Sequence, residues 1–280
     1  MLVNLNEILK IGQERGIAVG AVNTPNLETL SAVISAAQEL DVPVIVSHAQ
    51  IHEFINTIDV IGPIMLMLAK NAKVPVCVHL DHGETVEFCK KAIDLGFSSV
   101  MIDASTMAYE DNIRVTKEVV EYAHAHGASV EAELGQLPNR EDGGDSANDP
   151  TKLYTDPNLV PDFVNRTGVD ALAIAFGTAH GIYKVKPVLN IDIIRQVRAK
   201  SNIPLVMHGG SGLSHDDYRN AIEAGINKIN YYTYMNYEGY AACKEVIERN
   251  PTGFYHDLTI AARNAQANTI KTVLSVFAKK

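Results

Sequence analysis

The chain has few of the features that mark secreted, membrane-bound or nucleic-acid-binding proteins. It contains only three cysteines in 280 residues, at positions 77, 89 and 243, and they share no paired spacing. An odd, scattered set of this kind indicates a reducing compartment and no disulfides. Lys and Arg form no cluster, and the formal net charge is −9, so nucleic acid and anionic membrane are poor candidates as partners.

Long apolar runs and internal boundaries are absent as well. The first residues have neither a charged start nor a long apolar stretch, and the run at 61–69 is too short to span a bilayer. No segment rich in Pro and Ser divides the chain, and no sequence repeat is evident. We therefore expect one soluble, cytoplasmic domain over residues 1–280, and its 46% hydrophobic content suffices for a full core.

Short apolar runs alternate with longer amphipathic stretches along the whole chain. The runs that favour strands lie at 17–22, 43–47, 75–80, 98–102, 128–133, 170–175, 203–207 and 227–230. Helical apolar spacing follows each of them, at 26–40, 57–71, 84–95, 111–126, 157–167, 190–199, 215–224, and finally 235–249 with 257–278. Eight strands that each precede a helix predict an α/β fold, a (β/α)8 TIM barrel, although a doubly wound open sheet gives a similar alternation.

Two segments fall outside this alternation. Residues 136–158 form a long polar connection rich in Gly, Pro, Asn and Asp, which predicts an active-site lid. Residues from about 250 to 280 form a C-terminal helical extension beyond the last strand. The long C-terminal helices, 235–278, offer surface for a homodimer or homotetramer.

Three histidines stand at the ends of three predicted strands. Each of His82, His180 and His208 directly precedes a glycine, and Glu133 ends a fourth strand in a similar context. The C-terminal ends of barrel strands meet at one mouth, where these side chains would surround one ion. Imidazoles with a carboxylate suit Zn²⁺ that keeps one position open to substrate or water, so we expect one catalytic zinc ion per chain.

Asp81 directly precedes the first of these histidines. Because successive side chains alternate along a strand, Asp81 and His79 should share one face while His82 turns to the other. We expect Asp81 to act either as an outer partner of the metal site or as an acid/base group.

Two loops near the end of the chain suit a substrate phosphate. Gly209-Gly210-Ser211-Gly212 follows the run at 203–207, and Asn230-Tyr231-Tyr232-Thr233 follows the run at 227–230. Barrels often hold a phosphate between their last two loops, on backbone N–H groups and a helix N-terminus. Ser211 and Thr233 add hydroxyl donors there, and Lys184 supplies a balancing positive charge.

Six short motifs occur along the chain in the order of one known family. They are His79–Gly83, Ser99–Asp103, Val130–Gly135, Tyr154–Pro157, Gly177–Lys184 and His208–Gly212. Together they resemble the class II, metal-dependent fructose- and tagatose-bisphosphate aldolases, and the resemblance covers essentially the whole chain. It implies a zinc enzyme, with a monovalent cation as a further candidate. The implied reaction is the reversible cleavage of a phosphorylated ketose into dihydroxyacetone phosphate and an aldehyde.

The resemblance also implies the roles of single metal-site residues. It assigns the catalytic zinc to His82, His180 and His208, with Glu133 completing or alternating in the site. Asp103 matches a position associated with a second metal. Zinc takes the place of the Schiff-base lysine of other aldolases, and we expect no lysine in an apolar strand where its pKa would be depressed.

Proton transfer and substrate contacts follow from the same resemblance. Asp81 matches the group that exchanges the proton of the substrate's C4 hydroxyl. Glu141, on the lid, matches the group that moves the proton at C3 of dihydroxyacetone phosphate. The matches to substrate contacts are Asn23, Gly181, Gly210, Ser211, Asn230 and Thr233. Gly209 and Tyr232 join them as candidates from the phosphate loops above.

The segment after the second predicted strand departs from the family. His48, Gln50, His52 and Glu53 bring more hydrogen-bonding groups than the small or polar run usual there. A site that pairs substrate hydroxyls rejects analogues without them, so the segment predicts a polar aldehyde half. The alternative is that these side chains face solvent or a subunit interface.

Other departures and rival functions remain open at this point. The lid start at 137–140, the run at 231–234 and Thr106 also differ from the family, so the ketose is not restricted to fructose or tagatose 1,6-bisphosphate. Three histidines and an acid also suit a metal-dependent hydrolase or isomerase, although the first strand ends Ala21-Val22-Asn23 without a His-x-His pair. A non-catalytic sugar-phosphate sensor would be expected to lack a ligand or Asp81.

Overall fold

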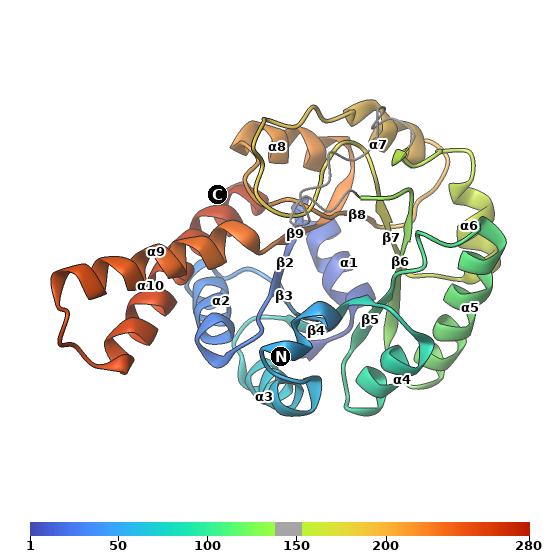
Figure 1. The fold of residues 1–280 in the computed structure, drawn as a ribbon. Coiled ribbons are helices and arrows are strands. Elements are labelled where there is room, and N and C mark those ends of the chain that lie inside the picture. Colours follow the sequence, from blue (N-terminus) through green and yellow to red (C-terminus); the bar gives the residue numbers. More distant parts are fainter. Residues whose placement is uncertain (138–152) are drawn as a thin grey trace.

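Eight parallel strands close into a barrel with helices around it in a computed structural model, which describes residues 1–137 and 153–280 (Figure 1). The strands are β2 Val19–Asn23, β3 Val44–Ala49, β4 Val76–Gly83, β5 Ser99–Ile102, β6 Ser129–Leu134, β7 Ala171–Ile174, β8 Leu205–Met207 and β9 Ile226–Tyr231. Strands adjacent in sequence are adjacent in the barrel, and β9 pairs with β2 to close it. The predicted TIM barrel is therefore confirmed over the open sheet.

A helix follows each barrel strand, and all but the last of these helices pack on the outside of the barrel. These helices are α2 Leu27–Leu40, α3 Ile58–Asn71, α4 Val86–Asp94, α5 Tyr109–Ala125, α6 Val160–Thr167, α7 Ile191–Arg198, α8 His215–Ala224 and α9 Thr233–Arg249. A single 3-10 turn, η1 Gln50–Phe54, precedes α3. Alternate strand residues face the two layers: Val44 and Val76 pack toward the helices, whereas Ile45 and Cys77 fill the barrel interior.

An N-terminal helix that the sequence analysis did not predict closes the end of the barrel at which the strands begin. After the short strand β1 Leu2–Val3, α1 Leu5–Arg15 buries Leu5, Ile8 and Leu9 against the interior strand residues. Its ends carry ordinary helix signals: Asn4 and Glu7 form a capping box, and Gly16 ends the helix in the left-handed region at φ 66°. The end at which the strands begin is therefore covered by α1.

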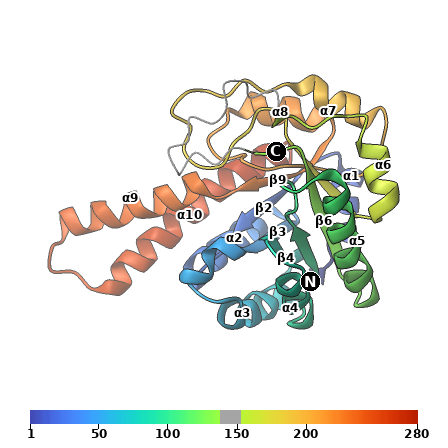
Figure 2. The ribbon, with the colours of Figure 1, turned by 45° about the vertical axis from the view of Figure 1, so that its right-hand side comes forward.

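Two C-terminal helices form an arm that projects away from the barrel (Figures 1 and 2). The arm consists of α9 and α10 Tyr255–Phe277, which pack against each other, while the last turns of α10 return to the barrel beside α2. Its outer part exposes large apolar side chains, among them Tyr240, Phe254 and Tyr255. Every helix in the described ranges is too short or too polar to cross a membrane.

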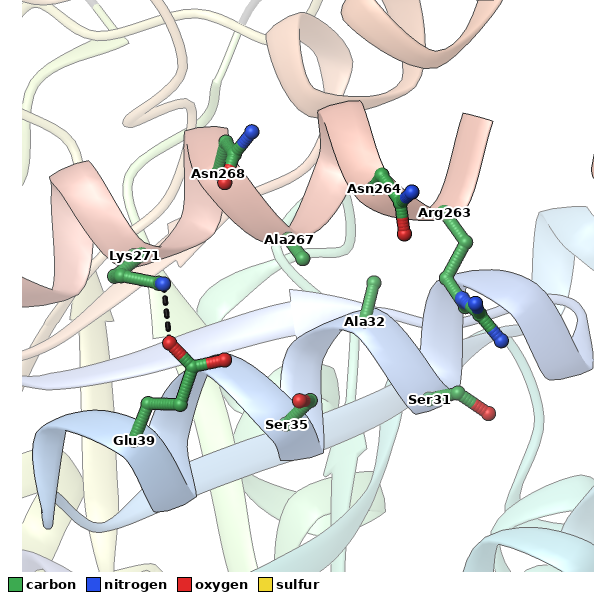
Figure 3. A pocket seen from close by; sticks show the side chains of 9 residues that line it. All are labelled: Ser31, Ala32, Ser35, Glu39, Arg263, Asn264, Ala267, Asn268 and Lys271. Carbon is green, nitrogen blue, oxygen red and sulfur yellow. Dashed lines mark hydrogen bonds and ion pairs between the residues drawn. The ribbon is translucent and has the colours of Figure 1, made fainter. Parts of the chain in front are cut away.

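A polar groove lies on the outside of the barrel between α2 and α10 (Figure 3). Lys271 on α10 pairs with Glu39 on α2, and Arg263, Asn264 and Asn268 also face the groove. The groove lies between helices rather than at the ends of the strands. The Lys271–Glu39 ion pair in the groove connects α10 with α2.

Candidate metal and substrate site at the barrel mouth

The three predicted histidines meet at the mouth of the barrel. The His82 ring centroid lies 5.0 Å from that of His180 and 4.6 Å from that of His208. One nitrogen from each ring lies within 4.8 Å of the other two, which is the spacing that one metal ion can bridge. The loops after β7 and β8 deliver His180 and His208, while His82 lies within the end of β4.

A local irregularity in β4 turns His82 into the site. Strict alternation would point His82 away from Asp81, which was the expectation from the sequence. Instead, His82 adopts φ 48°, and the pairing of β4 with β5 shifts register between Leu80 and Gly83. A positive φ is unusual for a residue with a side chain and concentrates at functional sites. The expected opposite facing of Asp81 and His82 was therefore wrong, because both side chains reach the mouth.

Hydrogen bonds to carboxylates fix how two of the rings face each other. His82 Nδ1 lies 2.8 Å from Asp103 Oδ2, and His208 Nε2 lies 2.8 Å from Glu131 Oε1. A carboxylate accepts, so these ring nitrogens carry the protons. The remaining nitrogens, His82 Nε2 and His208 Nδ1, lie 2.8 Å apart, and a proton on His82 Nε2 would bridge them. Without that proton both nitrogens offer lone pairs to the same space, so the donor set fits a metal ion.

The charges around the rings favour a cation at the same place. Burial lowers the pKa of His82, but the negative charges of Asp81, Asp103 and Glu133 outweigh it and raise the pKa to about 9. Burial and the neighbouring positive charge of His82 lower the pKa of His180 to about 3, so this ring offers lone pairs rather than a second charge. The cluster thus stabilises one positive charge, which a metal ion would supply.

Glu133 and Asp103 flank the histidines as predicted metal-site carboxylates. Their oxygens lie within 4.8 Å of each other and of a His82 nitrogen. Glu133 Oε2 is buried, has no hydrogen-bond partner among the described residues, and burial with the charge of Asp103 raises the Glu133 pKa to about 8. A buried carboxylate oxygen without a donor is what an ion would satisfy. Asp103, which also accepts from the Ser105 hydroxyl at 2.7 Å, holds the His82 ring.

Asp81 is held at the mouth by two predicted substrate residues. Asn23 Nδ2 donates to one oxygen at 3.0 Å and Asn230 Nδ2 donates to the other at 3.1 Å. Asp81 is only 2% exposed, and burial alone would raise its pKa. Positive charge at His82 and His208 instead keeps the pKa of Asp81 well below its usual range, so the group is an anion.

The two predicted phosphate loops lie against each other. Ser211 Oγ accepts from the backbone N–H of Tyr232 at 2.9 Å, and Gly210 N donates to Asn230 O at 3.1 Å. Thr233 is the first residue of α9, so the N-terminus of that helix opens between the loops. Gly209, at φ 63°, lies so close to Ala179 that a Cβ would come within 2.5 Å of the Ala179 oxygen.

Tyr183 ties this region to the loop that carries His180, although the sequence analysis assigned it no role. Its hydroxyl accepts from Ala179 N at 2.8 Å and donates to Gly209 O at 2.9 Å. Gly181, with φ 90°, is buried beside it, whereas Lys184 on the same loop is exposed. The loops that follow β7, β8 and β9 therefore form one connected surface.

Part of the predicted lid lies outside the described residues, and Glu141 is in that part. Of the lid at 136–158, the ends are described, and Gln136 N donates to Leu153 O at 2.9 Å. The two ends of the connection therefore meet directly beside β6, which carries Glu133.

The segment after β3 makes hydrogen bonds within the protein. His48 is fully buried and its Nε2 lies 2.7 Å from Glu53 Oε1, which also accepts from Ile58 N at the start of α3. Gln50 Oε1 accepts from the backbone of Glu84 at 2.8 Å. These interactions hold η1 in place, and contact of His48, Gln50 or Glu53 with substrate stays a prediction. His52 alone of the four still faces the loop after β9.

A buried charged network below the histidines was missed. Glu131 Oε2 pairs with Lys228 Nζ at 2.7 Å, and both side chains are fully buried. His79 Nδ1 contacts the Ser99 hydroxyl at 2.8 Å beside them. Lys228 lies in β9, and its ammonium is engaged by a carboxylate, so it differs from the free, buried amine of a Schiff-base site. Glu131 shares the inward face with Glu133, so strand alternation was a usable signal.

Comparison with known proteins agrees with this geometry. The family model "Fructose-bisphosphate aldolase class-II" matches residues 3–280. A fructose-bisphosphate aldolase of Staphylococcus epidermidis is 41% identical over 282 residues, covering 99% of this chain and 97% of that protein. One of Geobacillus stearothermophilus is 40% identical over 257 residues, covering 89% of this chain and 87% of that protein. The crystal structure of the YdjI aldolase from Escherichia coli K12 has a TM-score of 0.86 and 34% identity, covering 99% of this chain and 97% of that one.

A parallel barrel with convergent imidazoles and carboxylates at its mouth defines a class of lyases and hydrolases that work at a metal ion. The sequence comparisons decide within this class: the chain belongs to the class II fructose-bisphosphate aldolase family. It is an aldolase, a carbon–carbon lyase of carbohydrate metabolism. The resemblance found in the sequence is thereby confirmed, and the hydrolase, isomerase and sensor alternatives are set aside.

Proposed function

We propose that the chain catalyses the zinc-dependent, reversible cleavage of fructose or tagatose 1,6-bisphosphate into dihydroxyacetone phosphate and an aldehyde. The observation that carries this proposal is the convergence of His82, His180 and His208 on one point, with one nitrogen of each ring within 4.8 Å of the other two. These rings would hold one Zn²⁺ per chain, with Glu133 as an additional ligand and Asp103 at the position for a second metal. When bound, zinc polarises the substrate carbonyl and stabilises the charge that develops there.

Asp81 would accept the proton of the C4 hydroxyl as the C3–C4 bond breaks. Its ionised state and its two amide donors, Asn23 and Asn230, hold an oxygen lone pair ready without a proton of its own. The electron pair of the broken bond moves toward the ketose carbonyl. Glu141 on the lid would then return a proton to C3 of dihydroxyacetone phosphate.

The phosphate of dihydroxyacetone phosphate would lie between the loops after β8 and β9. Close backbone approach at Gly209 and Gly210, the Ser211 hydroxyl and the N-terminus of α9 at Thr233 support this position. Gly181 and Tyr232 border the same surface, and exposed Lys184 would add positive charge from the neighbouring loop.

The aldehyde half would lie on the side of His52. The His52 ring centroid is 4.8 Å from that of Tyr232, and its Nδ1 is buried without a partner among the described residues. Burial lowers the pKa of His52, while the nearby charge of Asp81 acts against that shift. An unpaired ring nitrogen near Asp81 suits a hydroxyl of the aldehyde half, which supports a polar aldehyde. A phosphorylated ketose other than these two bisphosphates is compatible with the same contact.

Further parts of the proposal concern the assembly and its surroundings. The apolar side chains exposed on the α9–α10 arm support a homodimer or homotetramer, because exposed patches of this kind commonly become interfaces. A monovalent cation as an accessory ion rests on the family resemblance. A cytoplasmic location rests on the scattered cysteines, which are all free.

The decisive experiment is cleavage of a panel of ketose phosphates by zinc-supplemented protein, with enzymatic trapping of the released triose phosphate. The panel contains fructose 1,6-bisphosphate, tagatose 1,6-bisphosphate and ketose 1-phosphates with unphosphorylated tails. We expect stoichiometric dihydroxyacetone phosphate from at least one bisphosphate. Release from the unphosphorylated tails alone would contradict the proposed substrates, and no release from any of them would contradict the reaction.

A further inference from the structure

A fully buried ion pair lies beneath one of the candidate metal ligands. Glu131 comes from β6 and Lys228 from β9, so residues 97 positions apart meet inside the barrel. The distance from Lys228 Nζ to Glu131 Oε2 is 2.7 Å, and both side chains have no exposed surface. Taking two charges out of water is costly, so a pair in this position calls for a reason other than stability.

The pair continues directly into the metal site. Glu131 uses its second oxygen, Oε1, to accept from His208 Nε2 at 2.8 Å. One oxygen of the carboxylate is therefore engaged by Lys228 and the other by His208. Because the carboxylate accepts at both oxygens, the His208 proton is held on Nε2, and Nδ1 presents its lone pair to His82 Nε2 at 2.8 Å.

We propose that the Glu131–Lys228 pair is a positioning pair for His208: it holds the ring in the orientation and tautomer in which Nδ1 binds the metal. Carboxylates that accept from the outer nitrogen of a metal-binding histidine orient the ring and increase its basicity. Asp103 does the same for His82, but at the edge of the site, where the two side chains are 24% and 26% exposed. Solvent can stabilise the charge of Asp103 at the edge of the site. In the interior, Lys228 stabilises the charge of Glu131 instead. This inference rests on the proposed zinc site.

The test is the zinc affinity of folded protein, measured by competition with a chromophoric chelator. The variants are Glu131→Gln and the double variant Glu131→Gln/Lys228→Met, which removes both buried charges together. Glutamine can present either its oxygen or its amide to His208, so it no longer selects one tautomer. We expect zinc Kd to rise roughly 10- to 100-fold in both variants. Circular dichroism of the metal-free proteins shows whether they fold like the wild type.

A matched control applies the same substitutions to an exposed pair. Lys90 on α4 and Glu118 on α5 are 2.8 Å apart with side chains 33% and 50% exposed. The double variant Glu118→Gln/Lys90→Met should bind zinc like the wild type. If the buried double variant also binds zinc like the wild type, the positioning inference is overturned while the proposed function stands. If the wild type itself binds no zinc, the proposed function fails first.

A second measurement needs no variant and therefore decides the matter even if the double variant does not fold. Nitrogen NMR of ¹⁵N-histidine-labelled, zinc-loaded wild-type protein reports which ring nitrogen is protonated. We expect His208 to carry its proton on Nε2 and to bind zinc through Nδ1. Zinc on Nε2 of His208 would overturn the inference.

Discussion

Replacing Asp81 with asparagine removes a charge from the barrel mouth while keeping the shape of the side chain. Asp81 is only 2% exposed and accepts from Asn23 at 3.0 Å and from Asn230 at 3.1 Å. An amide has one oxygen, so one of these contacts would place two donors face to face. A lost hydrogen bond with a buried donor left unpaired should lower the free energy of unfolding by about 1–3 kcal/mol.

The effect of Asp81→Asn on turnover should be larger than its effect on stability. General base catalysis contributes roughly 100- to 10,000-fold, so kcat for cleavage should fall by that factor. Exchange of the C3 proton of dihydroxyacetone phosphate with solvent should persist, because that step is assigned to Glu141. Steady-state cleavage rates and exchange followed by proton NMR measure the two effects separately.

Asp170→Asn provides the matched control. Asp170 directly precedes β7 at the opposite end of the barrel, where it accepts from Val130 N and Asn6 Nδ2, both at 2.7 Å. This variant should lose stability but retain kcat. The reasoning is refuted if Asp81→Asn cleaves substrate at a rate within about tenfold of the wild type, or if it loses proton exchange together with cleavage.

Three further substitutions test other parts of the site. Glu141→Ala should lower kcat far more than KM and suppress exchange of the C3 proton; normal exchange would move this role elsewhere. Gly209→Ala, at φ 63° and against the Ala179 oxygen, should raise KM and cost at least about 1–2 kcal/mol in a denaturation experiment, whereas unchanged values would show that the loop relaxes freely. His52→Ala should change the ratio of kcat/KM between fructose and tagatose 1,6-bisphosphate, with exposed His126→Ala as the control, and an unchanged ratio would remove His52 from specificity.

The barrel could be predicted because its signals are local. Apolar runs alternate with amphipathic stretches, and parallel strands in a barrel bring their C-terminal ends together. The arrival of His82, His180 and His208 at the same end of the barrel follows from that rule. The helix α1 also has a local signal in the sequence, the capping box of Asn4 and Glu7, so it too could have been predicted.

The features that could not be predicted depend on tertiary contacts. The inward turn of His82 requires a positive φ and a register shift between β4 and β5, and alternation along a strand does not reveal either. His48 was assigned to substrate because of its position, and the sequence did not reveal that its side chain packs on the outer side of the strand and pairs with Glu53. The partner of Lys228 lies 97 positions away, and a strand pattern does not specify such a partner.

The central claim is that a zinc ion held by the three histidines is required for carbon–carbon cleavage. The most direct measurement is the cleavage rate of metal-free protein as zinc is added back, with bound zinc determined on the same samples. The account predicts no activity without metal and a linear rise that ends at about one zinc ion per chain. Full activity in the metal-free protein, with no response to added zinc, would contradict it.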